Sequence, residues 1–339
     1  KDNSEAEQRI HRNLEKYFPS VSIPYHRVIP VLGNLMQKKL GLSETKFEEV
    51  AQAVGAIYHC GANVNMFYPY TALQSVNVRG THEVIKLAVT GSPKVLHHMS
   101  TLDVLESLAR TGTQTFYEDD DIAQGDGISG GYAQSKWIAE MLVKRAGRQG
   151  LPVCIYRPGM VTGHSKQGQS NTNDVLCRFL KSLIQLKRSP DLVMSIDMTP
   201  VDYVSKAIVQ LSLQPSSTGK TFHVVNPKPM ALSTLIDELE NVGYPTTKIP
   251  YPEWLKALHL EPNAMSALAA FTVEASAEEQ QTCLELWLGG NYIFDCQHTT
   301  QGLAAHSVSC PPADRELLRT YLSYFIQTGF VSATSYAEA

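Results

Sequence analysis

Short runs of apolar residues alternate with longer amphipathic stretches through the first two thirds of the chain. The short runs are rich in β-branched or aromatic residues and are bounded by turn residues, which is typical of strands. They are Arg27–Leu32, Ala56–Cys60, Lys94–Ser100, Pro152–Arg157 and Thr221–Val225. The helical stretches between them are Ser43–Val54, Leu73–Thr90, Tyr132–Gln149 and Asp202–Leu213. This alternation predicts an α/β fold, a doubly wound parallel sheet with helices on both faces.

The pattern changes after residue 225, where helical stretches separated by proline and glycine dominate. The expected helices are Leu232–Asn241, Glu253–Leu260, Ala264–Leu288 and Pro312–Thr328. We therefore predict a sheet domain over residues 1–225, with a loop over 164–190 that faces the substrate side. A mainly helical subdomain over 226–339 is expected to cover the carboxyl edge of the sheet. At the other end, Ile10, Leu14 and Phe18 predict an amphipathic helix within Lys1–Ser20.

Composition narrows the functional class. The chain has 339 residues, 43% of them apolar and 18% charged, which is typical of a folded globular protein. Its net charge of -4 argues against a nucleic-acid partner, and no apolar run approaches the roughly 18 residues that span a membrane. The six cysteines form no C-x-x-C pair, which favours a reducing, cytoplasmic setting and argues against a metal site.

The strongest chemical motif is the run YAQSK, from Tyr132 to Lys136. A spacing of four places both side chains on one face of a helix, and a nearby ammonium is expected to lower the pKa of the phenol. The motif follows a strand that ends in Ser100 and Thr101, so a hydroxyl can complete a Thr–Tyr–Lys set. Since alternation turns only one of the two hydroxyls toward the helix, Thr101 is the preferred member and Ser100 a polar strand end.

Two neighbouring patterns compete with this interpretation. Residues 127–131 match G-x-S-x-G, but the strand that a nucleophile elbow needs before its serine is missing. We take this match as a coincidence within a loop. The acidic run Glu118–Asp121 is expected to be a solvated, mobile loop. His97 and His98, adjacent in one strand, cannot both face one site.

Other candidate residues lie where strands end. Gly61 and Ala62 follow a strand directly, which lets a ligand approach the backbone. Asn77, in the following helix, is as well explained by a structural role as by a functional one. Residues 157–163 (RPGMVTG) provide a second backbone surface at the same edge.

Taken together, these motifs resemble the thioester reductase domains that end nonribosomal peptide and polyketide synthetases. The resemblance rests on AIYHCGANVN (56–65), NVRGT (77–81), MSTLDV (99–104), GYAQSKWIAE (131–140), YRPGMVTG (156–163) and TPVDYV (199–204). The chain is also similar to aminoadipate and carboxylic acid reductases, all within the extended short-chain dehydrogenase/reductase superfamily. The resemblance implies a Rossmann-like fold with a helical C-terminal substrate subdomain.

The resemblance also implies an activity. NADPH would reduce an acyl or peptidyl thioester, held on the phosphopantetheine arm of an upstream carrier domain, to an aldehyde and then to an alcohol if a second reduction follows. Thr101 and Tyr132 would bind the developing oxyanion, Tyr132 would donate the proton, and Lys136 would hold the nicotinamide ribose. The implied cofactor contacts are Gly61, Ala62, Asn77, Ser100, Lys136, Tyr156, Pro158, Gly159 and Val161. As an isolated domain we expect a monomer.

The sequence departs from the family pattern in two places. The first βαβ segment with its glycine-rich turn (T-G-x-x-G-x-x-G) is absent from this sequence, so weak cofactor binding and low activity are expected without it. The usual G-D-L reads Gly33-Asn34-Leu35. Two alternative functions stay open: a redox-independent, Dieckmann-type cyclising release domain, and a non-catalytic module that docks a carrier.

Overall fold

The fold is given by a computed structural model that describes residues 2–18, 22–66, 68–260 and 292–333. Its α-helices are α1 (Asn3–Tyr17), α2 (Glu44–Ala53), α3 (Tyr70–Gln74), α4 (Gly80–Val89), α5 (Glu106–Arg110), α6 (Gly131–Arg148), α7 (Val175–Leu186), α8 (Val201–Ser212), α9 (Leu232–Asn241), α10 (Tyr251–Leu260), α13 (Gln297–Leu303) and α14 (Arg315–Gln327). A π-helical turn, η3 (Ser75–Arg79), joins α3 to α4, and a 3-10 turn, η4 (Leu102–Leu105), precedes α5. The predicted helix Ala264–Leu288 lies outside the described residues.

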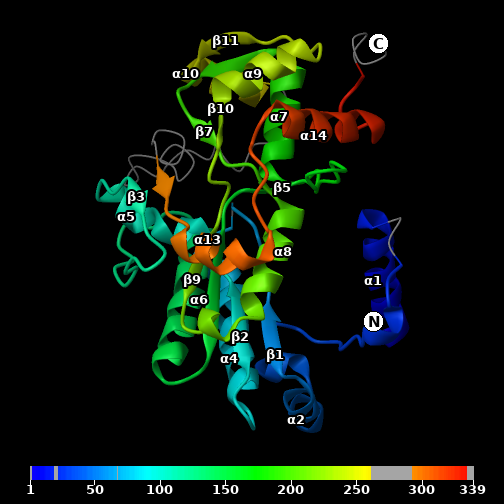
Figure 1. Ribbon diagram of the computed structural model, residues 1–339, viewed down its shortest axis with the longest axis vertical. Helices are drawn as coiled ribbons and strands as arrows, with labels where there is room; N and C mark the ends of the chain where they lie inside the picture. The colour runs from blue at the N-terminus through cyan, green and yellow to red at the C-terminus, as the bar shows by residue number, and fades with distance from the viewer. Residues whose placement is uncertain (1, 19–21, 67, 261–291, 334–339) are drawn as a thin grey trace.

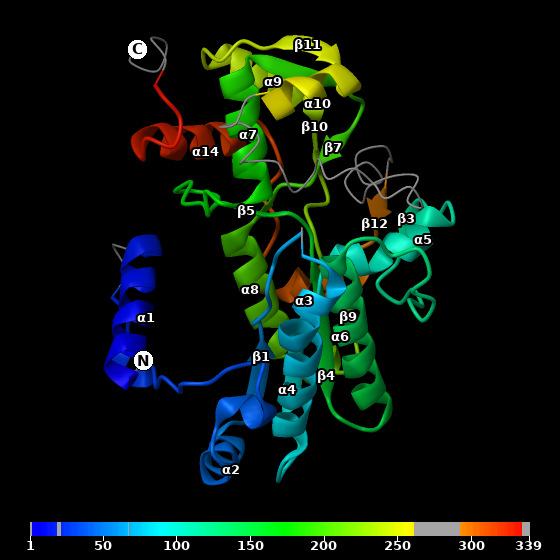
Figure 2. The same cartoon turned by 180° about the vertical axis from the view of Figure 1, so that it is seen from behind.

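The strands are β1 (Ala56–His59), β2 (Val95–Met99), β3 (Thr115–Phe116), β4 (Val153–Pro158), β5 (Val161–Thr162), β6 (Arg188–Asp191), β7 (Ser195–Ile196), β8 (Thr199–Pro200), β9 (Thr221–Val224), β10 (Met230–Ala231), β11 (Thr247–Pro250) and β12 (Ile293–Phe294). The central sheet has the order β1-β2-β4-β9, and all of its pairs are parallel. Helices α8 and α13 lie over the face seen in Figure 1. Helices α4 and α6 lie over the face seen in Figure 2. The predicted doubly wound parallel sheet is confirmed.

Alternation along the strands sorts side chains between the two faces. Leu96 and Ile155 join the apolar cluster beneath α4 and α6, whereas Tyr156 and Phe222 join the cluster beneath α8. Both faces are covered, so most strand side chains are buried, among them the polar side chains of His97, His98 and Arg157. Polar side chains collect at the carboxyl ends of the strands.

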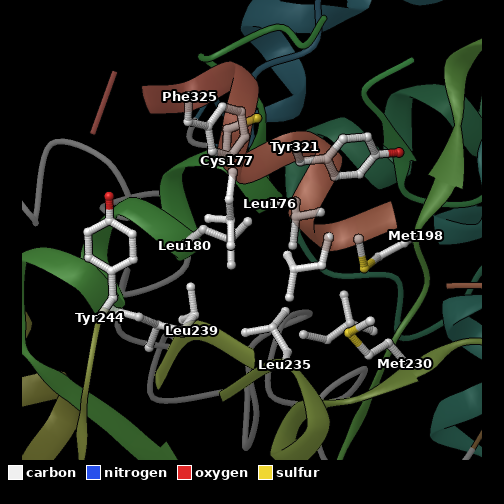
Figure 3. Packing of buried hydrophobic residues seen from close by; sticks show 14 of the residues in the cluster. Leu176, Cys177, Leu180, Met198, Met230, Leu235, Leu239, Tyr244, Tyr321 and Phe325 are labelled. Atoms are coloured by element: carbon white, nitrogen blue, oxygen red, sulfur yellow. The ribbon is translucent and has the colours of Figure 1, made fainter. Parts of the chain in front are cut away.

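The part of the chain beyond the sheet has a hydrophobic core of its own. Figure 3 shows Leu180 of α7 facing Leu235 and Leu239 of α9, and α10 and α14 contribute to the same cluster. Helix α14 is joined to the sheet domain by Tyr321, whose hydroxyl donates to the carbonyl of Gly163 at 2.9 Å.

This packing differs from the predicted division at residue 225. The stretch expected as a loop over 164–190 contains helix α7, and that helix packs with the later helices. Its apolar stripe, which includes Leu176, Leu180 and Leu183, is buried against them rather than against the sheet. This second hydrophobic core therefore draws on two separate stretches of sequence.

The predicted strand Arg27–Leu32 is wrong. These residues include the end of a 3-10 turn and then run without ladder pairing to any described strand. Pro30 has no N–H to donate, and the side chain of Ile29 is 83% exposed. None of the helices in the described ranges combines the length and hydropathy that a membrane crossing requires.

The acidic run Glu118–Asp121 is not uniformly solvated, contrary to the prediction. Glu118 is 2% exposed, and its carboxylate accepts hydrogen bonds from the backbone N–H of His223 at 2.8 Å and of Thr299 at 3.2 Å. The Thr299 hydroxyl donates to the same carboxylate at 2.9 Å, and the His298 N–H also donates. Glu118 thus fastens the start of α13 to the end of the sheet.

We expect Glu118→Ala to lower the free energy of unfolding by about 3 kcal/mol, because it leaves several buried N–H groups without an acceptor. Asp119→Ala is the matched control, since that side chain is 78% exposed, and it should change stability by less than about 0.5 kcal/mol. Chemical denaturation of the two variants measures both values. An equal loss in both would contradict the anchoring role of Glu118.

Candidate functional site

The three residues expected to act together come from two elements at the carboxyl edge of the sheet. Thr101 lies two residues after the end of β2, while Tyr132 and Lys136 lie in the first turns of α6. In open parallel sheets this edge is where ligands bind. The predicted helix at Tyr132–Gln149 is confirmed, with its start one residue earlier.

Two glycines determine where α6 begins. Gly130 is the N-cap residue at φ +77°, a conformation that favours glycine. A Cβ on Gly131 would lie 2.3 Å from the carbonyl oxygen of Tyr68 and from the backbone nitrogen of Tyr70. The start of α6 therefore touches the start of α3 backbone to backbone, and this contact holds Tyr132 in place.

Lys136 extends from α6 to the end of β2. Its ammonium donates to the carbonyl oxygen of Met99 at 2.5 Å. Burial lowers the pKa of Lys136 to about 8, against the opposing effects of the nearby Glu140 carboxylate and the Cys60 thiol. At neutral pH the side chain is therefore charged, although only by a small margin.

Tyr132 does not have the lowered pKa that the sequence predicted. Burial raises the pKa of its hydroxyl above the ordinary value, and the negative charge of Asp103 raises it further. The ammonium of Lys136 points to the Met99 carbonyl, so Asp103 is the charge that acts on the phenol. Within the described residues the Tyr132 hydroxyl makes no hydrogen bond, which leaves a protonated phenol available to a ligand.

The two hydroxyls at the end of β2 point to different partners. Ser100, not Thr101, contacts α6: its Oγ donates to Oε2 of Glu140 at 2.5 Å. Thr101 caps η4, donates to Oδ2 of Asp103 at 3.1 Å and accepts from the Asp103 N–H at 3.3 Å. The two hydroxyls thus point apart as alternation predicted, but Ser100 meets the helix, contrary to the prediction for Thr101.

Asn77 forms a buried polar link. Its amide nitrogen donates to the carbonyl of Asn63 at 3.1 Å and to Oγ of Ser135 at 2.9 Å, and its amide oxygen accepts from the Asn63 N–H at 2.7 Å. Ser135 precedes Lys136 on α6. Asn77, in the π-helical turn η3, therefore joins the loop after β1 to α6, which is the structural role left open from the sequence.

A buried charge network beneath the site was not anticipated. Arg157, fully buried on β4, donates from Nη2 to Oε1 of Glu140 at 2.7 Å and from Nη1 to Nε2 of His223 at 3.2 Å. Although burial would raise the pKa of Glu140, Arg157 lowers it to about 2. The one sequence signal was the spacing of Glu140, two helical turns after Tyr132 and on the same face.

The second backbone surface is built around Asp197, which the sequence analysis missed. Its carboxylate accepts from the Met160 N–H at 2.9 Å, from Oγ1 of Thr199 at 2.6 Å and from the Asn226 N–H at 3.1 Å. A Cβ on Gly159 would lie 1.7 Å from Asp197 Oδ2. Gly159 is thus required for this junction, and Pro158 and Val161 lie on the strands beside it.

Two predicted cofactor contacts have other roles in the structure. Tyr156 is fully buried, stacked on Phe222, and its hydroxyl is hydrogen-bonded to Nδ1 of His97 at 3.1 Å. Its side chain belongs to the core beneath α8 and is not available to a ligand. Gly61 lies against Leu35, whose Cδ1 would be 2.8 Å from an added Cβ, so the Leu35 side chain would have to move to admit a larger residue there. Ala62 follows in the same loop.

Comparison with known proteins places these features in a family. The profile of the NAD-binding family described as "Male sterility protein" matches residues 1–208. A linear gramicidin synthase protein of Brevibacillus parabrevis is 33% identical over 333 residues, covering 96% of this chain and 6% of that protein. L-2-aminoadipate reductase of Saccharomyces cerevisiae is 38% identical over 240 residues, covering 67% of this chain and 17% of that protein.

The solved structures agree. The terminal R domain of the myxalamid PKS-NRPS pathway superposes with a TM-score of 0.90 at 37% identity, covering 99% of this chain and 84% of that one. The chain therefore spans 84% of a known R domain, but less than a fifth of each of the two curated relatives.

The backbone contact at the start of α6 gives a direct test of the site's construction. Gly131→Ala should lower the free energy of unfolding by about 2 kcal/mol, because the added methyl overlaps backbone atoms that cannot turn aside. In Gly55→Ala the new Cβ meets nothing within 4 Å, so the change should stay below about 1 kcal/mol. Denaturation curves for both variants decide this. Equal stability of the two would contradict the close approach.

Proposed function

The chain belongs to the NAD-binding family described as male sterility protein, and from that premise we propose that it is a reductase domain that releases a carrier-bound acyl or peptidyl thioester as an aldehyde, using NADPH. The observation that carries the proposal is the pairing of an acid and a cation on the first turns of α6. A protonated Tyr132 hydroxyl without a hydrogen-bond partner in the described chain lies one helical turn from the Lys136 ammonium.

The chemistry of this site suits a carbonyl that gains negative charge. Tyr132 stays protonated well above neutral pH, so it can donate its proton to the oxygen of the reduced carbonyl. Thr101 can offer a second hydrogen bond once its hydroxyl turns from Asp103 to the substrate. The collapse of the resulting hemithioacetal breaks the C–S bond and returns the thiol to the carrier.

The residues present also fit a nicotinamide cofactor. The Lys136 ammonium has three N–H groups, and within the described residues only the Met99 carbonyl accepts from it. The remaining donors lie at the carboxyl edge of the sheet, where a ribose can accept from them. When bound, the nicotinamide supplies the hydride. Gly61, Ala62, Pro158, Gly159 and Val161 remain candidates for backbone contacts along it.

We expect the substrate to arrive on a phosphopantetheine arm. A thiolation-reductase di-domain from an archaeal nonribosomal peptide synthetase has the same fold, with a TM-score of 0.75. The relatives named above are much longer than the matched region, which is consistent with a carrier domain beside the reductase.

Replacement of the proposed acid tests the reaction type. Tyr132→Phe should reduce NADPH-dependent aldehyde release by about 100- to 10,000-fold, because the proton donor is lost. Tyr117→Phe, at a side chain that is 55% exposed, should leave release unchanged. Release by carbon–carbon cyclisation, or carrier docking without chemistry, would survive in Tyr132→Phe. Either result would contradict the proposal.

The pKa of Lys136 leads to a second test. Its pKa is lowered to about 8, so the ammonium is present below that pH and is lost above it. We expect kcat/KM to decline with an apparent pKa near 8, since a neutral amine binds the ribose hydroxyls less well. A pH–rate profile of the natural protein measures this. A profile that stays flat to about two units above this pKa would contradict the role of the ammonium.

A further inference from the structure

One buried imidazole near the site has no role in the reaction described above. His98 on β2 is 1% exposed, and neither of its ring nitrogens has a hydrogen-bond partner among the described residues. Its neighbour His97 is equally buried but has a partner, the Tyr156 hydroxyl at 3.1 Å. Buried polar groups are nearly always hydrogen-bonded in proteins, so an exception beside an active site calls for an explanation.

The strand geometry places His98 beneath Lys136. By the alternation of β2, His98 shares a face with Ser100, the residue that follows the strand, and Ser100 contacts Glu140 of α6. The Lys136 ammonium, from the same helix, is bonded to the carbonyl of Met99, the residue that joins the two. His98 therefore lies on the α6 side of the sheet, next to the backbone group that holds the ammonium.

The neighbouring strand contributes a second imidazole. His59 is the register partner of His98, and the two ring centroids are 5.5 Å apart. Thr81 donates its only hydroxyl hydrogen to the carbonyl of Asn77 at 2.6 Å, so His59 Nε2, at 2.9 Å from that hydroxyl, must donate to it. This contact fixes the proton of His59 on Nε2 and leaves Nδ1 unprotonated.

Both imidazoles are neutral. Burial and the Lys136 charge lower the pKa of His59 to about 4 and hold the pKa of His98 well below 6.5. A proton relay through them would have to create an imidazolium beside an ammonium, which these low pKa values oppose. A neutral imidazole, in contrast, always offers one nitrogen lone pair, which is a good acceptor for an ammonium.

We propose that His98 is a positioning residue for Lys136: the lysine side chain turns toward the unpartnered imidazole, whose unprotonated ring nitrogen then accepts one of the hydrogens that Met99 does not take and so stabilises the charged lysine. The inference rests on the proposed function of Lys136. It explains why a histidine occupies a place where an apolar side chain would otherwise suit the core beneath α6.

Other groups act on the same ammonium, and the test must keep them constant. Glu140 on α6 and Cys60 after β1 favour the charged lysine, and desolvation opposes it. Arg157 on β4 is paired with Glu140, while Asp103 in η4 acts on Tyr132. The variants below alter none of these residues.

The experiment compares two substitutions of His98 with one of His97 in the full-length natural protein. His98→Leu removes the acceptor, and the apparent pKa of the alkaline limb of kcat/KM should fall by about one unit. At a pH near 8 this corresponds to a loss of about five-fold, with little change near pH 6. His98→Gln keeps an acceptor and should restore the limb to its position in the unaltered protein. His97→Leu, on the opposite face, should not move it.

Three outcomes would overturn the inference. The apparent alkaline pKa of kcat/KM could stay unchanged in His98→Leu, or it could fall in His98→Gln or in His97→Leu by as much as in His98→Leu. If His98→Leu does not fold, His98→Met, closer to histidine in length, serves as the acceptor-free variant.

A readout that needs no turnover separates this inference from the proposed function. The 13Cε chemical shift of Lys136, assigned with Lys136→Met, reports the pKa of the ammonium directly. An absence of reductase activity in the unaltered protein would count against the proposed function alone. A Lys136 pKa that is the same with and without His98 would count against this inference alone.

Discussion

The buried carboxylate of Glu140 is the contact on which the rest of the site depends. It is fully buried and holds Arg157 of β4 and Ser100, the residue after β2, by hydrogen bonds at 2.7 and 2.5 Å, while Lys144 lies 3.4 Å away. A buried carboxylate is stable only when all of its hydrogen-bond and charge partners are present. The helix α6 is therefore fixed against the sheet at the position where Glu140 meets those partners. Lys136 and Tyr132, one and two turns earlier on the same face, are placed by that constraint.

The same network sets the electrostatics of the two catalytic candidates. The Glu140 charge partly offsets the desolvation of Lys136, which keeps the ammonium charged at neutral pH. No such compensation reaches Tyr132, where burial and Asp103 both favour the protonated phenol. The result is a fixed cation beside a neutral acid, which suits the protonation of a carbonyl oxygen better than it suits a phenolate base.

Much of the fold and the central motif could be predicted from the sequence, because both are encoded locally. The four central strands and helices such as α2, α6, α8 and α9 follow from hydrophobic period and turn residues. Tyr132 and Lys136 follow from helical spacing. The predicted strand at 27–32 failed because pairing depends on a neighbouring strand, which a pattern in one segment does not reveal.

The features that were missed depend on contacts between distant segments. Glu118 appears as part of an exposed acidic run until it meets His223 and Thr299, more than 100 residues later in the chain. Arg157 and Asp197 are equally dependent on the packed fold. The expected effect of Lys136 on the Tyr132 pKa failed for the same reason, since spacing along a helix does not show which acceptor the ammonium reaches.

The central claim is that this site reduces a thioester carbonyl and releases the product as an aldehyde. Its most direct test is product analysis of the full-length natural protein with a short acyl-pantetheine thioester and NADPH deuterated at the transferable position. The account predicts deuterated aldehyde, or the alcohol derived from it, together with free pantetheine thiol in proportion to the NADPH oxidised. Release as a carboxylic acid or a cyclised product, without oxidation of NADPH, would contradict it.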